Sequence, residues 1–172
     1  MQIQGFIGPS YKGRSSNVAA QTLYNWMPQS VETAEPWRVV YYPRPGKTVW
    51  CYLPTTPVRA VFHQDGRMFA VGGQVLYEVS DSGVLTTWGT LSALDKNPAT
   101  INSNGMAGHQ LYITSGGKGD IFDLVANTLT PITAAGYPTN SVMGTYLDTY
   151  FLTIQGGTAQ FNISDILDGA AW

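Results

Sequence analysis

The sequence predicts an all-β protein built from repeated antiparallel sheets, and three observations support this fold class. Charged residues make up only 12% of the 172 residues and glycine occurs 19 times, a composition that suits strands and turns better than helices. Strand-like apolar runs alternate with turn residues along most of the chain. A glycine pair recurs at Gly72-Gly73, Gly116-Gly117 and Gly156-Gly157, with spacings of 44 and 40 residues.

The glycine pairs mark a structural repeat. In each copy an aromatic residue precedes the pair and another follows it. Spacing near 40–45 residues, with several short strands per copy, is typical of propeller blades. We therefore predict a propeller-like array of antiparallel four-stranded blades, with about three visible in this chain. The predicted blades lie near residues 57–91, 97–133 and 140–172.

Each blade can be assigned strand by strand. Asp65-Gly66 predicts a two-residue hairpin turn, and the glycine pair turns the next two strands. The predicted strands of the first blade are 58–63, 67–71, 74–79 and 84–91. Those of the second are 98–102, 110–114, 120–125 and 128–133. Those of the third are 141–146, 149–155 and 158–164, and a fourth is expected where "DILDGAAW" begins.

Three blades do not close a ring, because closed propellers usually have at least four. We expect the chain either to be part of a longer polypeptide or to be completed by neighbouring subunits. Residues 38–42 and 48–53 predict two further strands, which form half a blade or complete another. The domain prediction is thus a partial propeller over residues 37–172.

Residues 1–36 differ in composition, since they are rich in Gly, Pro, Ser and Asn and show weak periodicity. They predict an extended N-terminal arm. Two interpretations stay open, one in which the arm lies on a neighbouring subunit and one in which it packs on its own domain.

The sequence contains no recognisable catalytic, cofactor or metal motif. His63 and His109 lack metal-ligand spacing, and Cys51 is the only cysteine, placed in an apolar run. "SGGKGD" departs from the phosphate-loop pattern, and most aspartates fall in turns. We predict a protein that is not an enzyme and has no cofactor or metal. No apolar run approaches 18 residues, so no membrane span is expected.

Charge is unevenly distributed. Residues 1–50 hold five basic and two acidic residues, a net charge of +3, and the remainder carries −5. A solvated loop surface and a contact with nucleic acid both explain this asymmetry. The candidate partner-interface residues are Tyr11, Lys12, Arg14, Arg38, Arg44 and Lys47. The five tryptophans and ten tyrosines suit blade packing or a subunit interface, with sugar-stacking platforms as the alternative.

The N-terminal motif and the repeat together resemble a known family. The segment "GFIGPSYKGRSSNVAAQTLYNWMPQSVE" is similar to the start of the packaged-DNA stabilisation, or tail accessory, proteins of short-tailed bacteriophages. The matching residues are Gly8, Ser10, Tyr11, Arg14, Ser15, Asn17, Asn25, Trp26 and Pro28. The segments at 42–48 and 57–79 and the closing "FNISDILDGAAW" also resemble that family, whose members are longer than this chain.

This resemblance implies a virion structural protein of the head–tail connector or tail hub, assembled in the host cytoplasm. Such proteins form a homo-oligomeric ring, commonly a hexamer. They contact the portal or adaptor and other tail proteins, and help retain packaged DNA. The resemblance carries over no catalytic residues.

Two functions of other classes remain as alternatives. A receptor- or carbohydrate-binding propeller predicts exposed aromatic residues repeated at one blade position. A propeller glycosidase predicts a pair of carboxylates facing each other across a cleft.

Overall fold

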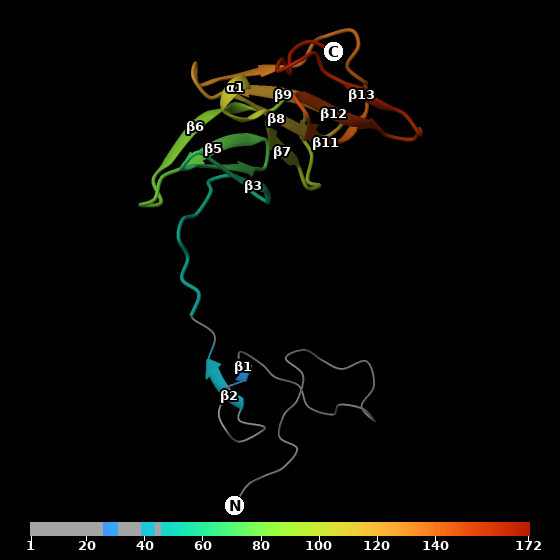
Figure 1. The fold of residues 1–172 in the computed structure, drawn as a ribbon. Coiled ribbons are helices and arrows are strands. Elements are labelled where there is room, and N and C mark those ends of the chain that lie inside the picture. The colour runs from blue at the N-terminus through green and yellow to red at the C-terminus, as the bar shows by residue number, and fades with distance from the viewer. Residues whose placement is uncertain (1–25, 31–38, 44–45) are drawn as a thin grey trace, which may run out of the picture. The chain divides into compact units, whose positions relative to one another are not determined.

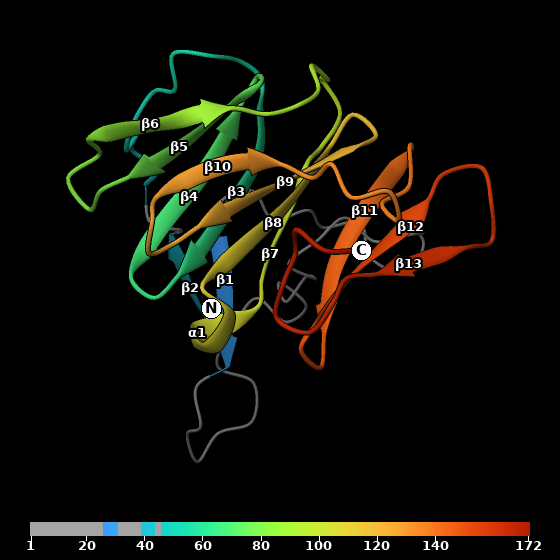
Figure 2. The same cartoon turned by 90° about the horizontal axis from the view of Figure 1, so that it is seen from above.

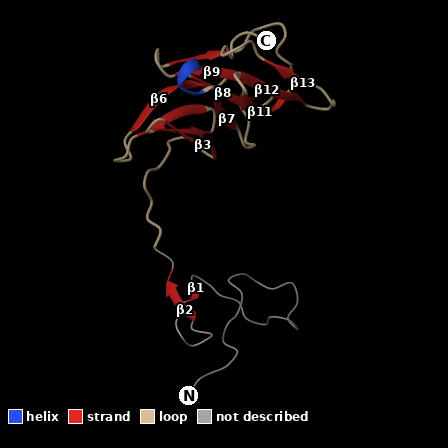
Figure 3. Ribbon diagram, viewed as in Figure 1, coloured by secondary structure: helices blue, strands red, loops and turns tan. Residues whose placement is uncertain are grey.

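The computed structural model describes residues 26–30, 39–43 and 46–172. The chain divides into two compact units, Met1–Val49 and Trp50–Trp172. Strands predominate in the described residues, as Figure 3 shows, and the all-β prediction is confirmed.

The described part of the first unit is a pair of antiparallel strands. β1 (Trp26–Ser30) pairs with β2 (Val39–Pro43), so that Trp26 lies opposite Pro43 and Ser30 opposite Val39. β2 matches the strand predicted at 38–42, but its described partner is β1 and not a strand of the repeat. Residues 1–25 and 31–36 of the predicted arm lie outside the described residues.

The second unit is described in full and contains three antiparallel sheets that follow one another along the chain (Figures 1 and 2). Neighbouring strands in each sheet are consecutive in sequence. Sheet 1 consists of β3 (Val58–Gln64), β4 (Arg67–Gly72), β5 (Val75–Val79) and β6 (Leu85–Thr90). Sheet 2 consists of β7 (Thr100–Ser103), β8 (Gln110–Ser115), β9 (Lys118–Asp123) and β10 (Thr128–Pro131). Sheet 3 consists of β11 (Ser141–Leu147), β12 (Tyr150–Gln155) and β13 (Phe161–Ile163).

The predicted turns form because their residues tolerate positive φ. Asp65 and Gly66 connect β3 to β4 with φ of 49° and 77°, as a two-residue hairpin requires. Gly116-Gly117 makes the equivalent turn between β8 and β9 with φ of 55° and 83°. In sheet 1 the turn is one residue later, since Gly72 still pairs with Val75 at the end of β4.

Sheet 3 differs from the predicted four-stranded blade because it has three strands. The segment after β13 folds back on itself instead of forming a fourth strand. The Asp165 N–H donates to the Ala171 carbonyl at 2.8 Å, and the Leu167 N–H donates to the Thr149 carbonyl at the same distance. Leu167 has a φ of 55°, which turns the chain away from an extended strand.

The prediction of a strand at 48–53 is wrong, since these residues belong to no strand ladder. Residues 50–53 lie over the outer face of sheet 1, where they border a cleft together with residues of β3, β4 and β5. The Trp50 indole N–H donates to the Asp81 carbonyl at 3.1 Å. The side chains of this segment thus cover part of a sheet face, and its backbone does not pair with a strand.

Two hydrophobic clusters hold the three sheets together. The first contains Phe69 of sheet 1 and Phe122 of sheet 2, and the second contains Tyr112 of sheet 2 and Phe151 of sheet 3. Along β8, Ile113 belongs to the first cluster and Tyr112 to the second, because successive side chains point to opposite faces. Sheet 2 is therefore the central layer, buried on both faces.

The first strands of the sheets are neighbours, since β7 contacts both β3 and β11. The Gly144 N–H of β11 donates to Thr100 Oγ1 at 3.0 Å, and Asn102 Nδ2 donates to the Gly144 carbonyl at 2.8 Å. A β-carbon on Gly144 would lie 2.3 Å from Cε1 of Tyr112. Glycine is thus required here for β11 to approach β7 and β8.

Among the described residues the only helix is α1 (Gly105–Gly108), a single turn between β7 and β8. His109 caps its C-terminal end with a φ of 54°. No helix in the described part of the chain is long and apolar enough to cross a membrane.

Candidate functional site

A buried arginine lies at the junction of sheets 1 and 2. The Arg59 side chain on β3 has no solvent exposure. Its guanidinium donates to the Asn97 carbonyl at 2.7 Å, the Gly73 carbonyl at 2.8 Å and Ser115 Oγ at 2.7 Å. The Asp95 carboxylate lies 3.6 Å from the same guanidinium. Arg59 therefore links the β4–β5 turn, the loop between the sheets and the end of β8.

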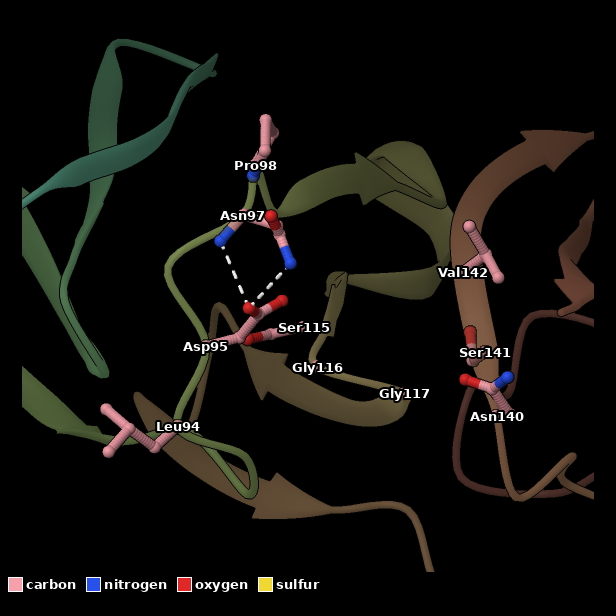
Figure 4. Close-up of a pocket in the computed structure, with 10 residues that line it drawn as sticks. All are labelled: Leu94, Asp95, Asn97, Pro98, Ser115, Gly116, Gly117, Asn140, Ser141 and Val142. Atoms are coloured by element: carbon pink, nitrogen blue, oxygen red, sulfur yellow. Dashed lines mark hydrogen bonds between the residues drawn. The ribbon is translucent and has the colours of Figure 1, made fainter.

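This loop borders a polar pocket of about 610 Å³ between sheets 2 and 3. Figure 4 shows the loop residues and Ser115 on one side and the start of β11 on the other. The pocket is lined by Leu94, Asp95, Asn97, Pro98, Ser115, Gly116, Gly117, Asn140, Ser141 and Val142. Its lining offers mainly hydroxyl, amide and backbone groups, which suits a ligand that forms hydrogen bonds.

Asp95 is the only acidic residue in this lining. It accepts hydrogen bonds from the Asn97 N–H at 3.1 Å and from Asn97 Nδ2 at 2.8 Å (Figure 4). The Asn97 backbone N–H, followed by the Lys96 N–H and the Arg59 charge, lowers the pKa of Asp95. Asp95 is thus a carboxylate at neutral pH, and the lining holds no second carboxylate or histidine that could act with it as an acid–base pair.

Asp120 is a buried acid, whereas Asp95 is only partly buried. Its two carboxylate oxygens accept hydrogen bonds from the Ser92 N–H at 3.2 and 3.1 Å, and Ser92 Oγ also donates to it. Burial raises the pKa of Asp120, and the Ser92 hydrogen bonds act in the opposite direction. Asp123 instead accepts from Val125 and Ala126 N–H groups in the β9–β10 turn. The two aspartates therefore bind different backbone groups and do not form a pair.

We expect Asp120→Asn to change how stability depends on pH. Because the folded-state pKa of Asp120 is raised, the folded protein keeps a proton that the unfolded chain has already released. The stabilising contribution of Asp120 is therefore greatest at low pH and declines as pH rises through the raised pKa. The stability of the parent protein relative to Asp120→Asn should fall as the pH rises from about 4, the ordinary pKa of an aspartate, toward neutral.

Urea unfolding of both proteins across this range measures that difference. A relative stability that rises with pH would contradict the prediction, because it would mean that the folded state favours the ionised carboxylate.

An aromatic cluster packs between sheet 2 and the C-terminal segment. The Tyr112 and Tyr137 hydroxyls share a hydrogen bond of 2.9 Å, and the Trp172 ring lies 4.9 Å from that of Tyr137. Burial is the main cause that raises the pKa of both tyrosines. Trp88 likewise packs on Phe122 and donates to Glu78. These side chains form core, whereas Trp50 is exposed.

The predicted partner-interface residues are mostly beyond the described part of the chain. Tyr11, Lys12, Arg14, Arg38 and Arg44 lie outside the described residues, and Lys47 is exposed. Their role in a partner contact stays a prediction. His63 and His109 are exposed beside turns, and Cys51 is half-buried. No group of three or more potential metal ligands occurs in the described residues.

Sheet 3 carries a surface that the sequence reasoning missed. Its side away from sheet 2 has five apolar side chains, which we call the free face. The free face consists of Met143, Leu152, Ile154, Phe161 and Ile163. The signal was present in β12, where Phe151 and Thr153 are buried against sheet 2 while Leu152 and Ile154 point the other way. A strand that is apolar on both faces is typical of a sheet covered on both sides.

Comparison with protein families and curated proteins identifies no relative. A scan against models of protein families finds no match, and no curated protein matches the chain. The function is therefore argued from the motifs, the sheets and the surfaces described above.

Proposed function

We propose that this chain is a non-enzymatic structural protein of a phage virion, in the head–tail connector or tail hub. Its subunits assemble as a ring that helps seal the portal and retain packaged DNA. The observation that carries the proposal is the free face of sheet 3, a wide apolar surface on a chain of three stacked sheets. Contiguous apolar surface of this kind marks sites of protein association. The N-terminal resemblance to tail accessory proteins supports the virion location.

The propeller-like arrangement belongs to the same proposal. The four-stranded meanders of sheets 1 and 2 and the three-stranded meander of sheet 3 stack face to face, and the first strand β7 contacts both β3 and β11. Blades around a central axis have this order, with the first strand of each blade nearest the axis. The sheet order and these strand contacts support the proposal.

Imaging of intact virions tests this function. A chain tagged at its N-terminus should be found as a ring at the portal vertex, and particles lacking the chain should lose DNA. Its location at fibre tips, or its absence from virions, would contradict the proposal.

Charge reversal in the basic group tests the DNA-retention role separately. Changing Arg38, Arg44 and Lys47 to Glu should lower the fraction of assembled particles that retain their genome, because phosphate contacts depend on positive charge. Genome content per particle is measured after a salt challenge. Reversing Lys96 and Lys118 in the second unit serves as the control, and equal losses in both variants would contradict a specific role of the basic group.

A second candidate is a receptor- or carbohydrate-binding module, which the polar pocket favours. Asp95, Asn97 and Asn140 present acceptors and donors around one cavity, as sugar hydroxyls require. Binding to a glycan panel that is lost in Asn140→Ala would support this function. Binding unaffected by that change would exclude the pocket as the sugar site.

A further inference from the structure

Two apolar surfaces lie at opposite ends of the series of sheets. The first is the free face of sheet 3. Met143 lies opposite Ile154, which lies opposite Phe161, and Leu152 lies opposite Ile163, so the five side chains form two adjoining cross-strand rows. Met143, Leu152, Ile154 and Phe161 border a cleft of about 290 Å³ whose lining contains no charged side chain. Removing such apolar side chains from water favours association.

The second surface is the outer face of sheet 1, on the side away from sheet 2. It comprises Val61, Met68, Ala70 and Val79 together with the overlying residues 50–53. Its cleft of about 310 Å³ is also lined without a charged side chain. Val61 is 61% exposed there, so the overlying segment leaves part of this face open.

The interior of the chain shows how such surfaces pair. Sheet 1 presents Phe69 and Val71 to the next sheet, and sheet 2 presents Tyr112 to the sheet that follows it. In β12 the residues on the corresponding side are Leu152 and Ile154 of the free face. The free face of sheet 3 is therefore the surface on which a further sheet would stack. The outer face of sheet 1 is the exposed surface at the other end of the stack.

We propose that the free face of sheet 3 binds the outer face of sheet 1 on a second copy of this chain. This inference rests on the proposed ring-forming function and identifies the surfaces that make the ring. A second copy is the occupant because one molecule carries both surfaces, each apolar, uncharged and hollowed to a similar volume. Contact between two different patches of identical subunits is head to tail, and it closes into a ring when the rotation between copies allows.

Crosslinking tests the pairing of the two surfaces. We would prepare Val61→Cys and Ile154→Cys as separate full-length proteins, each in a Cys51→Ser background, and treat them with a short bismaleimide. The mixture should give a crosslinked dimer containing one copy of each variant, and neither variant alone should crosslink. Crosslinking of Ile154→Cys with itself, without a mixed dimer, would show two free faces paired and would overturn the proposal.

Sedimentation of the full chain tests the energetics. Phe161→Lys should weaken self-association roughly tenfold or more, since it places a charge at the centre of the apolar surface. The control is Val125→Lys, because Val125 is 69% exposed in the β9–β10 turn and lies outside both surfaces. Circular dichroism checks that both variants fold. A parent chain that stays monomeric at high concentration, or equal losses in both variants, would overturn the proposal.

The outcomes separate this inference from the proposed function. A portal ring in virions without the mixed crosslink means that the function holds and other surfaces form the ring. A mixed crosslink without a portal ring means that the contact holds and the virion function fails.

Discussion

Phe122→Ala should lower the free energy of unfolding by about 4 kcal/mol. Phe122 has no solvent exposure, and its ring centroid lies 5.4 Å from that of Phe69 and 5.5 Å from that of Trp88. Removing the ring leaves a cavity where sheets 1 and 2 meet, and two regular sheets have little freedom to collapse into it. Urea unfolding at low protein concentration measures the loss.

Phe161→Ala is the matched control, because Phe161 is 66% exposed on the free face of sheet 3. Its effect on the unfolding of the monomer should stay below about 1 kcal/mol, while self-association weakens. Equal losses of monomer stability in the two variants would contradict the assignment of Phe122 to the core and Phe161 to an interaction surface.

Arg59→Met should destabilise the protein by about 3 kcal/mol. Methionine fills much of the same volume but donates no hydrogen bond. The carbonyls of Gly73 and Asn97 and the Ser115 hydroxyl then lose a donor in a buried place. The loop beside the polar pocket also loses the contact that holds it to β3.

Thermal and urea unfolding of Arg59→Met, compared with Lys96→Met, test this role. Lys96 is an exposed cation in the same loop, so its replacement should change stability by less than about 0.5 kcal/mol. A loss in Arg59→Met no larger than that of Lys96→Met would mean that the guanidinium network contributes nothing to folding.

Strand positions were predictable because their causes are local. The apolar runs at 67–71 and 110–114 and the turn residues Asp65-Gly66 act over a few neighbours, and they place β4, β8 and the first hairpin correctly. The prediction of a strand at 48–53 failed because its outcome depends on residues far away in the sequence. That run has strand-like composition, yet residues 50–53 form no strand and border the outer face of sheet 1, which is built from residues distant in the sequence.

The roles of the two arginines in sheet 1 were not predictable from spacing. Arg59 reaches Ser115, 56 residues away, and Arg67 donates to Glu78 in its own sheet and to Asn127 in sheet 2. Each arginine ties sheet 1 to sheet 2 at a different point. Such contacts depend on how whole sheets stack, and a local sequence pattern does not predict that arrangement.

The all-β class, the repeat marked by the glycine pairs and the hairpin turns follow from the amino-acid order, because backbone sterics and strand periodicity act between near neighbours. The pairing of β2 with β1, the three strands of sheet 3 and its uncovered face depend on the folded arrangement of the whole chain. Burial depends on which surfaces meet across long stretches of chain, so the free face of sheet 3 became visible only after the sheets were placed.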